Sequence, residues 1–393
     1  MVEAMEIQKG FKQTEVGVIP GDWCVKKLKE VANIRRGASP RPINDPKWFS
    51  DNGRGWVRIS DVTSSNVYLN STTQYLSEDG VRNSVAVDKG ALIMSICATI
   101  GIPIIINIPA CIHDGFVFFK NYEKELETFY LYFFLQKQTE ILTSKGQPGT
   151  QKNLNTTIVG NIDIAYPTKA EQTAIATALN DADAFITQLE KLIAKKRNIK
   201  QGAMQELLTG KKRLMGFNGK WDIKTLGDVC DIKTGKKDVN QGNPNGYYPF
   251  FTCSRESTYS DEYSFDGEAI LIAGNGEVGN LHYYVGKFEA YQRTYVLQNF
   301  TVGTNYLWYQ LLAFFKKSLG IGTIGSSIPY IKMENIAEFI FSTPKEESEQ
   351  TAIAQILSDM DTEIEALENK LYKYKMIKQG MMQVLLTGKV RLI

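Results

Sequence analysis

Apolar residues recur at alternating steps of four and three in two long segments of the chain, residues 171–214 and 349–392. This spacing is typical of the face by which one helix packs on another in a coiled coil. Each segment predicts a helix of roughly 36 to 40 residues, about 55–60 Å long. Because two such faces are most easily buried against each other, we expect the helices to pack together; two separate surface helices are the alternative. The residues assigned to this packing are Leu179, Ile186, Leu189, Ile193, Leu357, Ile364, Leu367 and Leu371.

The two helical segments are copies of each other. They align without a gap at an offset of 178 residues, and about 26 of the 44 positions are identical, so the chain contains an internal duplication. Both copies end in the sequence LLTGK, in which Gly210 and Gly388 suit a left-handed residue at the end of a helix.

The segments before each helix match more faintly. Trp23 and Gly37 correspond to Trp221 and Gly235, and further on Gly101 corresponds to Gly279. The whole unit is therefore doubled, as a globular domain and a long helix followed by a second globular domain and a second long helix. Because the helices have stayed alike while the globular domains have diverged, we expect the helices to meet common demands and the two domains to face different targets.

The globular parts are rich in predicted strands. Short apolar runs such as GWVRIS, GALIMSI and GFVFF alternate with Gly, Asn, Asp and Pro turns, and residues 100–110 predict a buried strand pair. One aromatic, helix-like stretch occurs in each domain, and its residues Tyr130, Phe133, Trp308 and Tyr309 are expected in the core. We predict an α+β fold in which two mixed α/β, strand-rich domains are joined by two long helices. The predicted boundaries are 1–168 for the first domain, 169–214 for the first helical region, 215–344 for the second domain and 345–393 for the second helical region.

Composition narrows the function classes. The five cysteines are scattered and never form a CxxC pair, and the two histidines, His113 and His282, lie far apart. A disulfide framework or a structural metal site is therefore not expected, and the cytoplasm is the expected location. The net charge is only +2. DNA-binding proteins usually carry a basic excess. For this chain to bind DNA, its basic surface must therefore be local, or partner subunits must supply it.

Several stretches carry a resemblance to a known family. KQTEVGVIPGDWCVKKLKEVANIRRGASP, WVRISDV and YLSEDGVRNSVAVDKGALIMSICATIG resemble the first target recognition domain of type I restriction-modification specificity subunits. MGFNGKWDIKTLGDVCDIKTGK resembles the start of the second such domain, and the EQTAIA…LLTGK segments resemble the helical regions that separate and follow the two domains. The resemblance covers essentially the whole chain in the family's usual order.

This resemblance implies a DNA-reading protein that does no chemistry of its own. Family members resemble a dumbbell, in which a pair of antiparallel coiled-coil helices separates two recognition domains related by a pseudo-twofold axis. Each domain reads one half of an interrupted, asymmetric DNA site, and the helices set the spacing. The implied partners are double-stranded DNA, two adenine-methylating modification subunits and the restriction subunits, with no membrane. S-adenosylmethionine, ATP and magnesium are expected on those partner subunits, and no cofactor is expected on this chain.

Polar loops supply the candidate DNA contacts, since guanidinium and amide groups can reach phosphates or base edges. Solvated loops with ordinary charges are the alternative interpretation, and Arg58 could equally be a strand residue paired with Asp61. The candidates in the first domain are Arg35, Arg36, Ser39, Arg41, Arg58, Lys145, Gln147, Thr150, Gln151, Lys152 and Asn153. The candidates in the second domain are Lys233, Lys236, Lys237, Asn275, Arg293, Ser326, Ser327 and Lys332.

Catalytic motifs are not found in the sequence. Gly274, Gly276 and Gly279 formally match the dinucleotide fingerprint GxGxxG, but the residues that follow read as a strand rather than the required helix. No nucleophile elbow, Walker loop or S-adenosylmethionine site is apparent. A single-chain DNA methyltransferase or nuclease is one alternative, but the sequence lacks the motifs that such an enzyme needs. A duplicated coiled-coil scaffold without DNA recognition is the other alternative.

Overall fold

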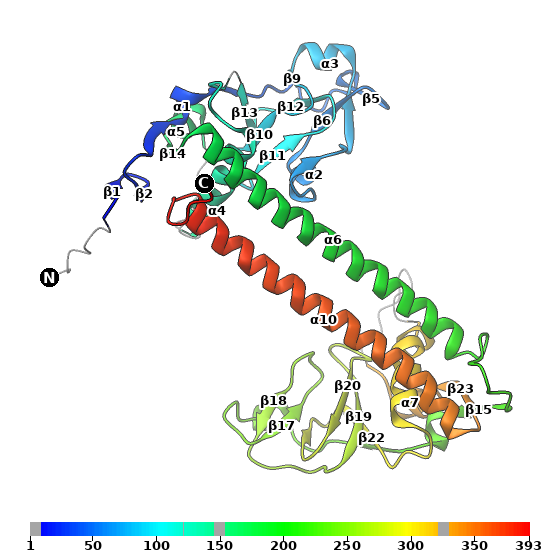
Figure 1. Ribbon diagram of the computed structural model, residues 1–393. Helices are drawn as coiled ribbons and strands as arrows, with labels where there is room; N and C mark the ends of the chain where they lie inside the picture. The colour runs from blue at the N-terminus through cyan, green and yellow to red at the C-terminus, as the bar shows by residue number, and fades with distance from the viewer. Residues whose placement is uncertain (1–8, 121, 145–153, 321–329) are drawn as a thin grey trace. The chain divides into compact units, whose positions relative to one another are not determined.

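The computed structural model describes residues 9–120, 122–144, 154–320 and 330–393. Its residue contacts divide the chain into two compact units (Figure 1). The first unit contains Met1–Gln188 together with Leu371–Ile393, and the second contains Leu189–Lys370. Each unit therefore holds one globular domain and a part of each of two long helices, α6 (Lys169–Leu207) and α10 (Glu347–Leu385).

Two five-stranded sheets form the globular domain of the first unit. Their strand orders are β4-β13-β10-β11-β7 and β5-β8-β6-β12-β9, and two-stranded sheets β1-β2 and β14-β3 accompany them. Short helices α1 (Leu28–Val31), α2 (Ile59–Thr63), α3 (Glu78–Arg82) and α5 (Thr156–Gly160) join the strands, and α4 spans Thr128–Ser144. The strands are β1 Phe11–Thr14, β2 Gly17–Pro20, β3 Cys24–Lys27, β4 Asn33–Arg36, β5 Phe49–Ser50, β6 Arg54–Val57, β7 Tyr68–Leu69, β8 Gln74–Leu76, β9 Val85–Val87, β10 Leu92–Ser95, β11 Pro103–Ile106, β12 Ala110–Ile112, β13 Phe116–Lys120 and β14 Asp163–Tyr166.

Strand β10 shows why the central strands are apolar without alternation. Leu92 and Met94 pack in one core with Tyr130 and Phe133 of α4, whereas Ile93 packs in a second core on the other face of the sheet. Because successive side chains of a strand point to opposite faces, a strand covered on both faces is apolar throughout. Tyr130 and Phe133 are fully buried, which confirms that this aromatic stretch belongs to the core.

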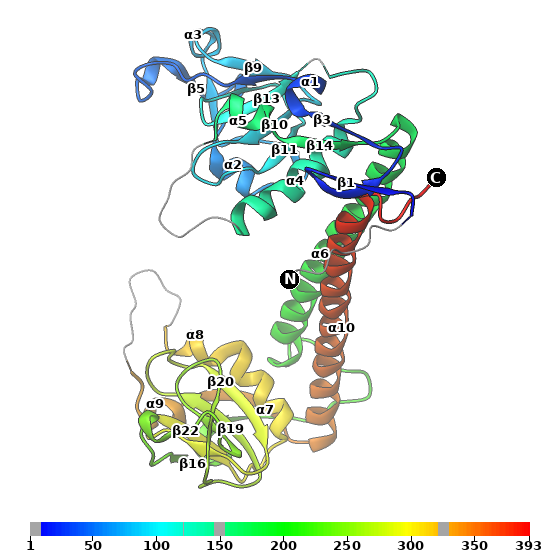
Figure 2. The same ribbon diagram turned by 90° about the vertical axis from the view of Figure 1, so that its left-hand side faces the viewer.

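The second unit repeats this arrangement on a smaller scale. A four-stranded sheet has the order β16-β22-β19-β20, and β18-β17-β21 and β15-β23 are smaller sheets. Helix α7 (Thr304–Gln310) lies against the four-stranded sheet (Figure 2), where Tyr306 and Leu307 pack with Ile270 and Leu297. Short helices α8 (Lys316–Ser318) and α9 (Met333–Ala337) follow. The strands are β15 Trp221–Thr225, β16 Asp231–Thr234, β17 Tyr248–Phe251, β18 Thr258–Ser260, β19 Glu268–Ala273, β20 Leu281–Val285, β21 Glu289–Ala290, β22 Thr294–Gln298 and β23 Ile340–Pro344.

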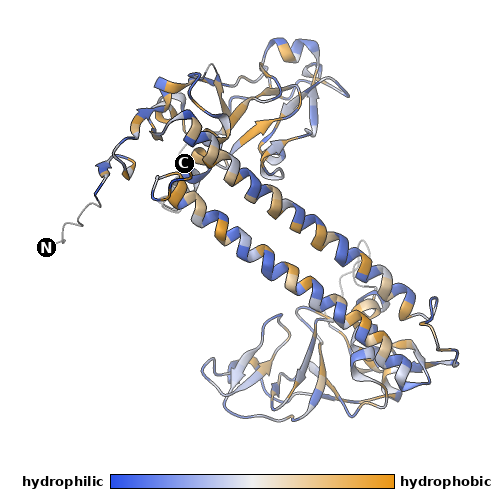
Figure 3. Ribbon diagram, viewed as in Figure 1, coloured by the Kyte–Doolittle hydropathy of each residue, from blue (hydrophilic) through white to orange (hydrophobic). Residues whose placement is uncertain are grey.

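The two long helices run antiparallel within each unit. In the first unit Lys378 of α10 forms an ion pair of 2.7 Å with Asp183 of α6. In the second unit Lys200 of α6 forms the equivalent ion pair with Asp361 of α10. Apolar and polar residues alternate along both helices (Figure 3). Each helix is 39 residues long, as the four-three spacing predicts.

The packing residues predicted from the helical spacing are largely buried. Leu367 and Leu371 are half-buried, because a contact between two helices covers only a narrow stripe of each. Gly210 and Gly388 end their helices with φ values of +68° and +66°, which confirms the left-handed termini. The fully or nearly fully buried packing residues are Leu179, Ile186, Leu189, Ile193, Leu357 and Ile364.

Two local predictions need correction. Residues 100–110 do not form a strand pair, because β11 and β12 belong to different sheets: β11 pairs with β10 and β7, and β12 pairs with β6 and β9. Arg58 is not a strand residue either. It precedes helix α2, and its backbone N–H, rather than its guanidinium, donates a hydrogen bond of 2.9 Å to the carboxylate of Asp61.

Candidate nucleic-acid interface

Four segments of the first domain meet beside the end of strand β4. The backbone N–H groups of Gly37 and Ala38 donate to the carbonyls of Phe116 and Ile112, at 2.9 and 3.1 Å. The N–H of Ile96 donates to the carbonyl of Gly115 at 2.8 Å, and that of Leu154 donates to Ile96 at 3.0 Å. We call residues 37–41, 96, 112–115 and 154 the first loop cluster. It brings residues 37–41, which include the candidates Ser39 and Arg41, together with Leu154, the first described residue after the candidates between 145 and 153.

The second domain has the same backbone hydrogen bonds between the corresponding residues, and we call this shared set of hydrogen bonds the backbone frame. The N–H of Gly235 donates to Thr294 at 3.2 Å, that of Gly274 to Arg293 at 2.9 Å, and that of Ile331 to Gly274 at 2.8 Å. We call residues 235–238, 274–275, 291–293 and 330–332 the second loop cluster. The predicted candidates Lys236, Lys237, Asn275, Arg293 and Lys332 all lie in it.

A glycine makes the closest approach possible in each cluster. A Cβ atom on Gly37 would lie 2.1 Å from the carbonyl oxygen of His113, and one on Gly235 would lie 1.8 Å from that of Ala290. Any other residue would force the two backbones apart. The matching Gly37 and Gly235, visible in the sequence, are therefore explained by the packing of two loops rather than by a turn.

Asp114 gathers three of the predicted side chains in the first loop cluster. Its carboxylate accepts hydrogen bonds from the Ser39 hydroxyl at 2.7 Å and from Arg41 Nη2 at 2.9 Å. Its carbonyl accepts from Arg36 Nε at 2.6 Å. Partial burial raises the pKa of Asp114, but the Ser39 hydrogen bond and the Arg41 charge outweigh it, and the net pKa is lowered. The arrangement holds the carboxylate ionised beside two arginines.

His113 lies next to this carboxylate. Its Nδ1 accepts a hydrogen bond from the N–H of Gly115 at 2.8 Å, so the neutral ring carries its proton on Nε2. Burial lowers the pKa of His113 below its usual 6.5, against the opposing effect of Asp114. The ring packs edge-on against Phe116, with centroids 4.8 Å apart. His113 therefore supports the loop as a neutral, packed side chain.

The second loop cluster has different chemistry on the same frame. At an offset of 178 residues, Gln292 stands in the place of Asp114, and Arg293 stands in the place of Gly115. Lys237 is tied to carboxylates, since its Nζ lies 3.1 Å from Glu262 and 3.6 Å from the fully buried Glu289. Lys236 is exposed. The cluster thus presents cations without a counterpart of Asp114.

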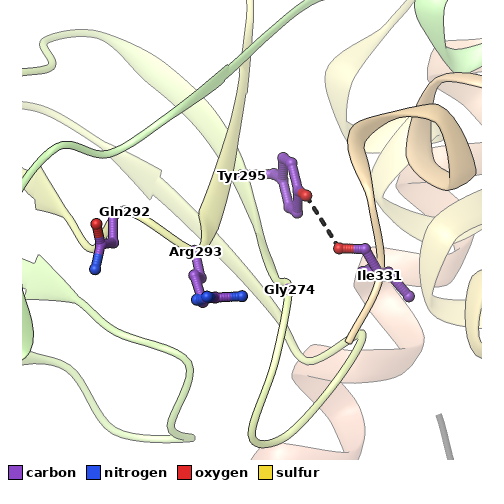
Figure 4. A pocket seen from close by; sticks show the side chains of 5 residues that line it. All are labelled: Gly274, Gln292, Arg293, Tyr295 and Ile331. Carbon is purple, nitrogen blue, oxygen red and sulfur yellow. Dashed lines mark hydrogen bonds between the residues drawn. The ribbon is translucent and has the colours of Figure 1, made fainter. Parts of the chain in front are cut away.

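A cavity of about 290 Å³ opens within the second loop cluster. Gln292 and Arg293 line it from the start of β22, and Gly274 lines it from the turn after β19 (Figure 4). Tyr295 closes one side by donating its hydroxyl to the carbonyl of Ile331 at 3.0 Å. Asn275 forms a backbone bridge with Tyr330 beside it. Three separate chain segments therefore converge on one opening.

The remaining candidates are distributed more widely. Arg35 and Lys233 are exposed on the equivalent edge strands β4 and β16, and Lys332 is exposed just before α9. Sequence reasoning considered Gln292 beside Arg293 but missed Asp114, although the 178-residue offset pairs Asp114 with Gln292. The following candidates lie outside the described residues: Lys145, Gln147, Thr150, Gln151, Lys152, Asn153, Ser326 and Ser327.

Two kinds of site are absent from the part of the chain that the structure describes. Within residues 9–120, 122–144, 154–320 and 330–393, no three His, Cys, Asp or Glu side chains are grouped as metal ligands would be. In the same ranges no helix combines the length and apolar character needed to cross a bilayer.

Known proteins share both the sequence pattern and the fold. The chain is 24% identical over 438 residues to the MjaVIII specificity subunit of Methanocaldococcus jannaschii, covering 100% of this chain and 99% of that protein. It is 36% identical over 167 residues to the EcoDI specificity subunit of Escherichia coli, a match that spans 42% of this chain and 37% of the relative. The S subunit from M. genitalium has the same fold, with a TM-score of 0.62 at 14% identity over 93% of this chain and 96% of that one.

A match to a family model shows to which protein family the chain belongs. The model for the type I restriction modification DNA specificity domain matches residues 20–201 and again residues 218–373. Each match contains one loop cluster and most of one long helix, so the duplication seen in the sequence is a duplication of this domain. The chain therefore belongs to the family of type I restriction-modification DNA specificity proteins, and it carries two copies of the specificity domain.

Proposed function

We propose that each domain of this specificity subunit reads one half of a bipartite, asymmetric DNA site. The observation that carries the proposal is the pair of loop clusters. Their backbone hydrogen bonds are equivalent, from Gly37 and Gly235 through Gly115 and Arg293, whereas their polar side chains differ. A common frame with exchanged side chains is what two readers of different base sequences require, since base edges are distinguished by donor and acceptor groups.

The helix pair sets the distance between the two half-sites in this proposal. A rigid separation of readers fixes the spacing of the DNA sequences they bind. Lys378 with Asp183 and Lys200 with Asp361 fix the register of the two helices in the two units. Both lysines are largely buried, so sliding one helix along the other would leave buried charges unpaired.

The exposed faces of the helices support docking of modification subunits. Ile199 and Ile377 occupy equivalent positions and are 46% and 42% exposed. Three residues further on, Gly202 and Gly380 have open space where a Cβ would stand. No neighbouring atom of the described chain requires glycine at either position. A glycine on a helix near an exposed isoleucine allows close approach by another protein.

We assign methylation, translocation and cleavage to partner subunits, with S-adenosylmethionine, ATP and magnesium bound there. The turn Gly274–Gly279 supports this assignment, because it leads into strand β20 and not into the helix that a dinucleotide site needs. Since the DNA target and the partner subunits of such a complex are cytoplasmic, we place the chain in the cytoplasm.

Co-expression with the neighbouring modification subunit, followed by mapping of methylated adenines in the host genome, tests the proposal. The expected result is an interrupted two-part motif whose methylation disappears when this chain is omitted. A complex that assembles but methylates no such motif would contradict DNA recognition and favour a coiled-coil scaffold.

A further inference from the structure

The backbone around Arg293 is held by three other segments. The N–H of Tyr291 donates to Phe251 at 3.0 Å, that of Gln292 to Lys237 at 3.0 Å, and the carbonyl of Arg293 accepts from Gly274 at 2.9 Å. The sulfhydryl of Cys253 lies 3.4 Å from the same carbonyl. This loop is therefore fixed before any ligand arrives, and a fixed loop lowers the ordering cost of a contact.

The guanidinium of Arg293 is left available by this arrangement. Only two arginines occur between residues 215 and 344, Arg255 and Arg293. Arg255 is bound to Glu277 at 2.8 Å, whereas no carboxylate of the described residues lies within salt-bridge range of Arg293. Its side chain lines the cavity of about 290 Å³ (Figure 4). An exposed arginine with a fixed backbone and no acceptor among the described residues is suited to an external one.

The other polar side chains at the cavity use their own donors within the chain, which leaves the Arg293 guanidinium as the donor that faces a ligand. The Tyr295 hydroxyl is used by Ile331, and the Gln292 amide nitrogen lies 3.3 Å from Asp238. A guanidinium fork matches the paired acceptors O6 and N7 of guanine, whereas adenine places a donor beside N7. The first domain has glycine at the equivalent position, Gly115, so it cannot supply the same contact.

We propose that Arg293 reads a guanine in the half-site bound by the second domain, and that the first domain has no counterpart of this contact. The inference rests on the proposed function and deepens it, because it assigns one base to one residue. Replacing Arg293 should change one position of one half-site and leave the other half-site intact.

The test uses the assembled complex of this chain with its modification subunits and a library of duplexes in which both half-sites are randomised. Arg293→Gln should weaken the preference for guanine at one position by roughly 5- to 150-fold, with adenine gaining, since glutamine pairs with adenine. Arg293→Lys should also relax that position, because a lysine lacks the fork, while the salt dependence of binding stays unchanged.

Arg255→Gln is the matched control and should leave both half-sites unchanged. Equal weakening for all sequences with Arg293→Gln, restored by Arg293→Lys, would show a phosphate contact and overturn the guanine assignment. A selected motif without a guanine that responds to Arg293 would overturn it as well. Failure of the proposed function is a separate outcome, in which the unaltered complex selects no bipartite motif at all.

Discussion

Arg213 and Glu349 form a two-point ion pair, with Nε and Nη2 of the arginine 2.6 and 2.7 Å from the two carboxylate oxygens. Glu349 is 1% exposed, and it belongs to the first turn of α10, whereas Arg213 follows the end of α6. The duplicated partners in the first unit, Arg391 and Glu171, are joined in the same way. Each pair fastens the end of one long helix to the beginning of the other within its unit.

Arg213→Ala should lower the local free energy of unfolding of the second unit by about 3 kcal/mol, because it leaves a buried carboxylate without its partner. The measurement is amide hydrogen exchange in β15 and the start of α10 of the full chain. Lys212→Ala is the control, since Lys212 is 71% exposed and lies 3.9 Å from Glu206. Equal exchange in the two variants would contradict the structural role of the pair.

Gly37→Ala and Gly235→Ala should each disturb one loop cluster. The added methyl would overlap the carbonyl of His113 or of Ala290, and such overpacking costs about 1–3 kcal/mol. We expect Gly37→Ala to reduce discrimination in one half-site and Gly235→Ala in the other, measured as affinity for duplexes with one half randomised. Lys212→Ala, at an exposed side chain outside both loop clusters, should affect neither half. Loss of both halves with either loop variant would argue against independent readers.

His113 makes the stability of the first unit depend on pH. Burial lowers its pKa in the folded chain below the value of 6.5 that it has when unfolded. The unfolded chain therefore binds a proton more readily, and stability present above pH 6.5 is lost as the pH falls toward the folded pKa. Between about pH 7.5 and about pH 5, the urea midpoint should fall more in the wild type than in His113→Asn. Parallel curves would contradict this.

Gly202→Leu and Gly380→Leu should weaken assembly with the modification subunit without lowering the stability of the chain. Neither added side chain meets an atom of the chain at its Cβ, and leucine favours a helix over glycine by roughly 0.5–1 kcal/mol. The melting temperature should therefore hold or rise, while binding of the modification subunit weakens. Pull-down of the co-expressed subunit and analytical ultracentrifugation measure the binding. Unchanged assembly with both leucines would exclude this face as the docking surface.

The sequence was sufficient for features that depend on local spacing. The four-three steps from Leu179 to Ile193 predicted a helix and its buried side, and Gly210 marked its end. The aromatic cores were also predictable, because Tyr130 and Tyr309 occur in apolar stretches at helical spacing.

Features that depend on distant residues were not predictable. Arg36 and Arg41 were chosen for their charge, but Asp114, more than 70 residues away, binds both of them. The separation of β11 and β12 into two sheets is likewise set by β10 and β6, which pair with them from elsewhere in the chain. Such pairings are decided by the folded backbone, and one sequence does not reveal them.

The backbone frame of the loop clusters bears on how new specificities arise. The hydrogen bonds through Gly115 and Arg293 use carbonyl groups, which every residue type provides. Side chains at the exposed positions can therefore drift while the frame keeps its stability, and a change of target need not be preceded by a stabilising mutation elsewhere. Two independently drifting readers on one chain multiply the number of target combinations that a lineage can explore.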